Sequence, residues 1–274
     1  MKGSDRENID GTVNLSYRID KFNFSNQTNI SYTDISNNVV PFSSFSSANP
    51  YQPKYNEQGE VDKVIDTYIG SNYAETNVYN PLWDFRQKSF NTGDILTFRN
   101  NFMVEYRPIR QVRIQGKFGL NTTREGSEVF KSPFASEFTG LETLKRGTYN
   151  KQNQRSTSYD GSLIASYGDT KGKHTYNVLG GAQLTESNIN LESYAAQGYI
   201  SDMFSNPNFS TGYPDGAKPY SSISKTRSAS FYLNGNYAYD MRYLLDFNIR
   251  NDGASVFGVD NPFSTTWSFG VGWN

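Results

Sequence analysis

The pattern of links between alternating segments most constrains what this chain can fold into. Apolar residues recur at every second position in about nine segments, whereas helical periodicity is almost absent. Because successive side chains of a strand point to opposite faces, each segment has one apolar face. The predicted strands cover residues 13–19, 22–32, 96–106, 112–120, 159–167, 176–184, 229–239, 243–249 and 267–273.

Short and long links alternate strictly between these strands. The short links are Asp20-Lys21, Arg107–Arg110, Gly168–Gly172 and Asp240–Arg242, and the long ones span residues 33–94, 121–156, 185–227 and 251–264. A soluble domain rarely holds several loops beyond about 15 residues. Bacterial outer-membrane barrels have short periplasmic turns and long extracellular loops, and no apolar run is long enough for a membrane-spanning helix. The pattern therefore predicts an antiparallel transmembrane β-barrel.

Aromatic residues cluster beside the short links. They make up 15% of a chain whose mean hydropathy is only -0.69. Tyrosine suits the membrane interface because its ring prefers the hydrocarbon edge while its hydroxyl needs water. The alternative is that tyrosine is simply a good strand former. We predict a membrane-interface girdle at the short-link end, made of Tyr17, Tyr106, Tyr167, Tyr176, Tyr239 and Tyr243, with Phe22 and Tyr237 beside them.

Composition disfavours several functional classes. The net charge of -1 gives no basis for nucleic-acid binding, and without cysteine there are no disulfides or thiolate metal sites. The single histidine, His174, lies at the end opposite the long links, where a substrate would not first arrive. Gly168–Lys173 lacks the spacing and the following Ser or Thr of a phosphate-binding loop. We therefore predict no enzyme, no metal and no cofactor.

The long links contain the candidate contact residues. Exposed rings there either stack on sugars or pack against a partner, and the alternative is that they pack on each other to order the loop. The candidates are Tyr51, Tyr55, Trp83 and Phe85 in the first long link and Tyr199 and Tyr213 in the third. In the last link we predict a turn motif of Asp252, Gly253, Phe257 and Gly258, with Asp252-Gly253 folding the loop back. A calcium site at Asn251-Asp252 is the alternative, but it lacks spaced carboxylates.

Four segments carry a resemblance to a known family. Asn49–Glu60, Tyr79–Asp84, Tyr243–Gly258 and Trp267–Asn274 stand in that order. Together they resemble the middle of the barrel of SusC/RagA-like TonB-linked outer-membrane proteins of Bacteroidetes, over residues 11–274. The resemblance implies a barrel of roughly 22 strands. It also implies a plug, a SusD-like lipoprotein lid, and uptake of glycans or peptides driven by the TonB complex through an N-terminal part.

These residues are expected to form only part of such a protein. Nine is an odd number of strands, whereas single-chain bacterial barrels use an even number. We expect residues 1–274 to be a partial TonB-dependent receptor barrel, with signal peptide, plug and C-terminal strands elsewhere. The rival is a secreted soluble all-β carbohydrate-binding or adhesin module. A barrel in outer-membrane lipid predicts an exposed apolar band about 25 Å tall, whereas the module predicts two packed sheets.

Overall fold

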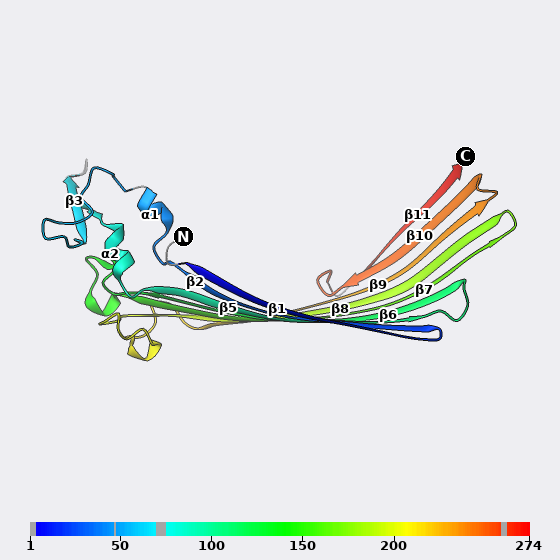
Figure 1. Ribbon diagram of the computed structural model, residues 1–274, viewed down its shortest axis with the longest axis horizontal. Coiled ribbons are helices and arrows are strands. Elements are labelled where there is room, and N and C mark those ends of the chain that lie inside the picture. Colours follow the sequence, from blue (N-terminus) through cyan, green and yellow to red (C-terminus); the bar gives the residue numbers. More distant parts are fainter. Residues whose placement is uncertain (1–3, 47, 70–74, 259–261) are drawn as a thin grey trace.

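The chain forms one large antiparallel sheet. The computed structural model describes residues 4–46, 48–69, 75–258 and 262–274. Nine strands pair in the order β1-β2-β5-β6-β7-β8-β9-β10-β11, so each strand lies beside the next large strand along the chain (Figure 1). Their bounds are β1 Asp5–Ile19, β2 Phe22–Asn37, β5 Phe90–Tyr106, β6 Val112–Lys131, β7 Thr148–Lys171, β8 His174–Gln197, β9 Tyr220–Tyr239, β10 Tyr243–Ala254 and β11 Phe263–Trp273. This confirms the predicted fold class.

The sheet is curved, and its short turns and long links lie at opposite ends of the strands (Figure 1). Smaller elements occupy the long links at the loop end. The link between β2 and β5 holds a separate hairpin, β3 (Val64–Ile69) with β4 (Glu75–Tyr79), which the sequence reasoning missed. It also holds the helices α1 (Phe42–Ser46) and α2 (Pro81–Arg86). Three 3-10 turns lie in later links, at Ser136–Phe138, Thr143–Lys145 and Pro207–Phe209. Among the described residues, no helix is long and apolar enough to cross a membrane.

Most strands are longer than predicted. β7 and β8 each have 24 residues, whereas the sequence pattern indicated strands only at 159–167 and 176–184. Beyond those positions most residues are polar and the few apolar ones, such as Ile189 and Leu191, lie on the opposite face, so the original alternation ends although the backbone ladder continues. The long links are correspondingly shorter than predicted, and three of them cover residues 132–147, 198–219 and 255–262.

The short turns lie where predicted, with one correction. The turn between β7 and β8 is Gly172-Lys173, because β7 runs on through Gly168 to Lys171. Left-handed backbone closes three of these four turns: Gly172 has φ 60°, Asp20 has φ 49° and Met241 has φ 52°. Glycine adopts that conformation freely, whereas Met241 does so against the clash of its Cβ with the backbone.

Candidate functional site

The strand register gives the sheet one apolar and one polar face. Directly paired residues of antiparallel strands lie on the same face. Followed from β1 to β11, the pairing puts the alternating apolar residues of all nine strands together; we call this the apolar face. Its members include Leu15, Phe24, Phe102, Phe118, Leu163, Val178, Leu233, Phe247 and Phe269.

No second layer of the described residues covers this face. Leu15, Leu163 and Phe269 are 63%, 57% and 61% exposed, although a soluble sandwich would bury such side chains between two sheets. The large sheet forms a single layer (Figure 1). This arrangement contradicts the soluble all-β alternative.

The apolar face has the height of a membrane core. Tyr106 lies ten positions after Leu96 in β5, which corresponds to about 33 Å along a strand. Barrel strands tilt by about 40°, which reduces this length to about 25 Å along the membrane normal. Beyond this band the same face becomes polar, with Asp94 in β5 and Arg155 in β7.

The predicted girdle residues all lie on the apolar face at the short-turn end. Two pairs among them stack: Tyr167 with Tyr176 at 5.9 Å between ring centroids, and Tyr239 with Tyr243 at 6.4 Å. Tyr106 stacks on Phe22 at 4.5 Å. Tyr17 pairs with Phe24 in the next strand. The six tyrosines therefore lie in one band of the apolar face, near the short turns. Their contact with the membrane interface stays a prediction.

Sequence reasoning missed two parts of this aromatic pattern. Trp273 pairs with Tyr243, and Arg242 lies over both rings at 5.8 and 5.9 Å. A second aromatic row lies eight or ten positions from the girdle on the same face. It contains Tyr32, Phe98, Tyr159, Phe231 and Phe263. The signal that could have found it is the recurrence of aromatic residues at this spacing and parity.

His174 belongs to the girdle region. Its Nδ1 lies 2.7 Å from the Tyr237 hydroxyl, and its ring packs edge-on against Tyr239 at 5.1 Å. Both neighbours are aromatic side chains of the same face, so the histidine extends the aromatic row. Among the described residues, no three His, Cys, Asp or Glu side chains gather where they could hold a metal ion.

The opposite face, which we call the polar face, is lined by amides and hydroxyls. Asn14, Gln27, Asn101, Lys117 and Asp160 line one groove of about 470 Å³ there. A second groove, of about 540 Å³, lies nearer the short turns. Its polar lining residues are Arg107, Arg110, Gln111, Arg113, Ser166, Asn177, Asn234 and Asn236, and the apolar Leu179 lies among them on the same face. Such donors and acceptors suit a hydrated passage or a polar ligand rather than lipid.

An ion-pair cluster lies at the short-turn end of the polar face. Glu105 is 7% exposed and accepts from Arg113 at 2.6 Å and from Arg107 at 2.8 Å. Two cations on one carboxylate leave unmatched positive charge beside the second groove.

The long links are tied to one another by polar contacts. Trp83 Nε1 donates to the Phe134 carbonyl at 3.0 Å, which joins the first long link to the second. Ser136 N donates to Asp84 Oδ1 at 2.6 Å across the same junction. Lys145 pairs with Asp215 at 2.9 Å, which joins the second link to the third. The first three long links therefore form one connected platform at the loop end.

The predicted contact residues differ in accessibility. Tyr51, Tyr55 and Tyr213 are 94%, 51% and 52% exposed, so their rings are available to a ligand or partner. Phe85 is 37% exposed and packs edge-on against Phe45 at 6.2 Å. Trp83 is half-buried and uses its indole N–H within the platform. These two residues order the loops at least as much as they present a surface.

Tyr199 is a correction to the predicted contact set. It is 1% exposed and packs edge-on against Phe130 at 5.1 Å, in a small core with Tyr149 and Ala196. Its hydroxyl is buried without a hydrogen bond of normal geometry among the described residues. Burial raises the pKa of Tyr199 to about 12. The alternative interpretation, in which loop aromatics pack to order the loop, holds for this residue.

The predicted turn at Asp252-Gly253 is also wrong. Both residues belong to β10 and pair with strands on either side, and the turn begins at Ser255. The ladder continues because Gly253 leaves room for the Phe263 ring, whose nearest atom would lie 2.4 Å from an added Cβ. Asp252 pairs with Arg250 at 2.7 Å instead of capping a turn. Gly258 lies in the link with φ 96°, and Phe257 N donates to the Ala254 carbonyl at 3.1 Å.

Known proteins resemble this chain in sequence and in fold. No family profile matches the chain. It is 28% identical over 265 residues to TonB-dependent receptor P26 of Formosa agariphila, an alignment that covers 95% of this chain and 26% of that protein. The chain thus spans about a quarter of that relative. All the relatives named here are receptors or transporters by name, and none is named as an enzyme.

Solved structures show the same fold. The RagAB peptide transporter matches with a TM-score of 0.74 at 16% identity, over 98% of this chain and 30% of that chain. The 'open-open' state of the RagAB peptide importer gives 0.71 at 17% identity, again over 98% and 30%. BauA, the ferric preacinetobactin receptor from Acinetobacter baumannii, gives 0.51 at 12% identity over 98% and 37%.

Proposed function

Since the chain is part of a TonB-dependent receptor barrel of the outer membrane, we propose that the complete protein imports an oligomeric nutrient, a glycan or a peptide. The polar face lines the lumen in this proposal and the apolar face meets lipid. The amide-rich grooves carry the proposal, because sugars and peptides both bind through many hydrogen bonds. The remaining parts, including the plug and further strands, lie outside these residues.

We also propose a lipoprotein lid of the SusD type. The connected loop platform with exposed Tyr51, Tyr55 and Tyr213 supports it, since exposed aromatic rings are frequent in protein interfaces. The similar solved structure is named the RagAB peptide transporter, which favours a peptide as the first cargo to test. Energy would come from the TonB complex acting on the part of the protein before this sheet.

The test uses the full-length receptor in its own bacterium. An affinity-tagged receptor is purified from outer membranes, and co-purifying lipoproteins are identified by mass spectrometry. Uptake of fluorescent oligosaccharides and oligopeptides is then compared in wild-type cells, in cells without the receptor and in cells without TonB. We expect one lipoprotein at equal stoichiometry and uptake of one ligand class that requires TonB. Uptake that neither the receptor nor TonB influences would overturn the proposal.

Substitutions at two neighbouring residues test which face of the sheet lines the lumen and which face meets lipid. Asn101→Trp fills the polar-face groove of about 470 Å³ and should reduce uptake severalfold. Phe102→Trp, one residue later, points to the apolar face and should leave uptake unchanged. Equal effects of both substitutions would contradict the assignment of the faces.

A further inference from the structure

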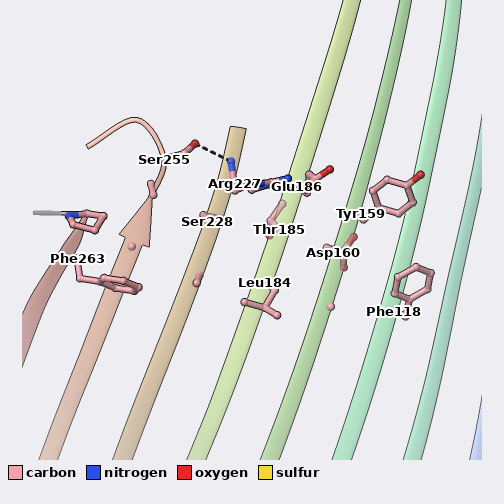
Figure 2. A pocket seen from close by; sticks show the side chains of 15 residues that line it. Phe118, Tyr159, Asp160, Leu184, Thr185, Glu186, Arg227, Ser228, Ser255 and Phe263 are labelled. Carbon is pink, nitrogen blue, oxygen red and sulfur yellow. Dashed lines mark hydrogen bonds and ion pairs between the residues drawn. The ribbon is translucent and has the colours of Figure 1, made fainter. Parts of the chain in front are cut away.

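One recess lies on the apolar face, unlike the grooves of the polar face. Its volume is about 550 Å³, and it runs from the middle of β6 to β9 to the loop ends of β10 and β11 (Figure 2). Phe118, Leu184 and Phe263 form its apolar walls. The strand register puts Gly161 and Ala229 between these walls on the same face, where no large side chain fills the space. The recess therefore has the width and the lining to hold a hydrocarbon chain.

A charged rim borders this recess on its loop-end side. Glu186 pairs with Arg227 at 2.7 Å and with Lys225 at 2.6 Å (Figure 2 shows Glu186 beside Arg227). Arg227 N donates to Ser255 Oγ at 3.0 Å, the dashed line in Figure 2, which anchors the rim to the β10–β11 link. Two cations face one carboxylate, so the rim keeps an excess positive charge. The rim lies where the apolar band gives way to polar residues.

Two arginines face each other just beyond the rim. Arg124 of β6 and Arg155 of β7 are directly paired on the apolar-face side of the sheet, and both are exposed. Neither makes an ion pair with any acidic group in the described part of the chain. Like charges directly opposite one another destabilise a sheet unless an anion lies between them. Arg155 lies four residues from the recess residue Tyr159, about 13 Å along the strand.

We propose that this surface binds a phosphorylated acyl lipid of the outer leaflet, with the chemistry of lipopolysaccharide. An acyl chain occupies the recess, and phosphate groups lie on Arg124 and Arg155 and, two strands further along the sheet, on Lys225 and Arg227. Arginine suits phosphate because its planar group donates two parallel hydrogen bonds. The four cations exceed the one rim carboxylate, Glu186, by three charges, which matches an anionic headgroup. The proposal needs only the outer-membrane location and not the proposed nutrient import.

The first experiment removes the paired charges. Full-length receptor is purified in detergent, and its binding of purified lipopolysaccharide is measured by native mass spectrometry and by thermal shift. Arg124→Gln with Arg155→Gln should weaken binding about tenfold or more. The matched control is Arg99→Gln with Lys117→Gln, which removes the same charge from the polar face and should retain wild-type lipid binding. Unchanged binding in the Arg124/Arg155 variant would overturn the proposal, as would equal loss in the control.

The second experiment fills the recess and varies the ligand. Gly161→Leu adds an apolar side chain where a Cβ meets no atom within 4 Å, so the fold should tolerate it while the acyl chain is displaced. We expect it to weaken lipid binding without changing the affinity for inorganic phosphate. Dephosphorylated lipid should bind the wild-type receptor about as weakly as the Arg124/Arg155 variant binds intact lipid. If inorganic phosphate displaces the lipid completely at low concentration, the site is one for a free anion and the lipid proposal fails.

Discussion

Asn26 and Asn100 pair through both of their amide groups in the middle of the apolar face. Asn26 Nδ2 donates to Asn100 Oδ1 at 3.2 Å, and Asn100 Nδ2 donates to Asn26 Oδ1 at 3.1 Å. Thr28 joins them, since its hydroxyl donates to Asn26 at 3.0 Å and accepts from Asn100 at 2.7 Å. Polar groups facing lipid are costly unless they are satisfied, and this cluster satisfies itself.

The amide pair predicts that substitutions of Asn26 and Asn100 have non-additive effects on stability. Asn100→Ala should destabilise the barrel by about 1–2 kcal/mol, because it leaves the Asn26 amide unmatched against lipid. Asn26→Leu combined with Asn100→Leu should be neutral or stabilising, because both unmet groups disappear together. Urea unfolding of the full-length receptor in lipid vesicles measures both. A double variant that is less stable than the Asn100→Ala variant would contradict the self-satisfied cluster.

The buried hydroxyl of Tyr199 leads us to expect a loss of stability at alkaline pH. Burial raises its pKa to about 12 in the folded state, from the ordinary tyrosine value of about 10. The folded state therefore holds the phenol proton more tightly than the unfolded state does. The stability that Tyr199 contributes to folding in this way is complete below about pH 10 and is lost as the pH rises from 10 toward 12. Tyr199→Phe should remove this part of the alkaline loss. It should also raise the stability near neutral pH, because a buried hydroxyl without a hydrogen bond is removed.

The measurement is the unfolding free energy of the full-length receptor between pH 8 and about pH 11. Tyr51→Phe serves as the control, since that ring is 94% exposed and its removal should leave the pH profile unchanged. A Tyr199→Phe profile that parallels the wild type throughout would show that this hydroxyl does not titrate with folding.

We expect a glycine at position 241, in the turn between β9 and β10, to stabilise the folded barrel. The φ of Met241 is 52° and lies in the left-handed region, which costs a residue with a Cβ about 1 kcal/mol or more. Met241→Gly should therefore stabilise the folded barrel by up to about 1 kcal/mol, after the entropy cost of glycine. Met241→Ala keeps the Cβ and should bring no gain. Equal stability of the two variants would mean that the Met241 backbone is relaxed.

Tryptophan fluorescence tests the membrane band directly. Trp267 and Trp273 are 76% and 74% exposed on the apolar face, whereas Trp83 belongs to the loop platform. In variants of the full-length receptor that keep one tryptophan each, lipids brominated along the acyl chain should quench Trp267 strongly. Trp83 should be quenched by aqueous iodide or acrylamide and hardly by brominated lipid. Quenching of Trp83 by lipid in preference to Trp267 would remove the physical basis of the transmembrane assignment.

The sequence by itself determined the class of fold, the number of large strands and the end at which the girdle lies. These properties are local: side chains alternate with a period of two, and a link is short or long wherever the chain is read. The tyrosines near short links, such as Tyr17 and Tyr243, needed only that information to be assigned to one end.

Only the tertiary structure decided which residues meet across strands. Direct pairing of Arg124 with Arg155 and the hydrogen bonds between Asn26 and Asn100 depend on the register between strands, and a slip of one residue would move every side chain to the other face. The same reason explains the errors. Partners distant in sequence set three features through pairing and packing: the strand length beyond the apolar band, the burial of Tyr199 and the strand conformation of Asp252. The local alternation carries no information on those partners.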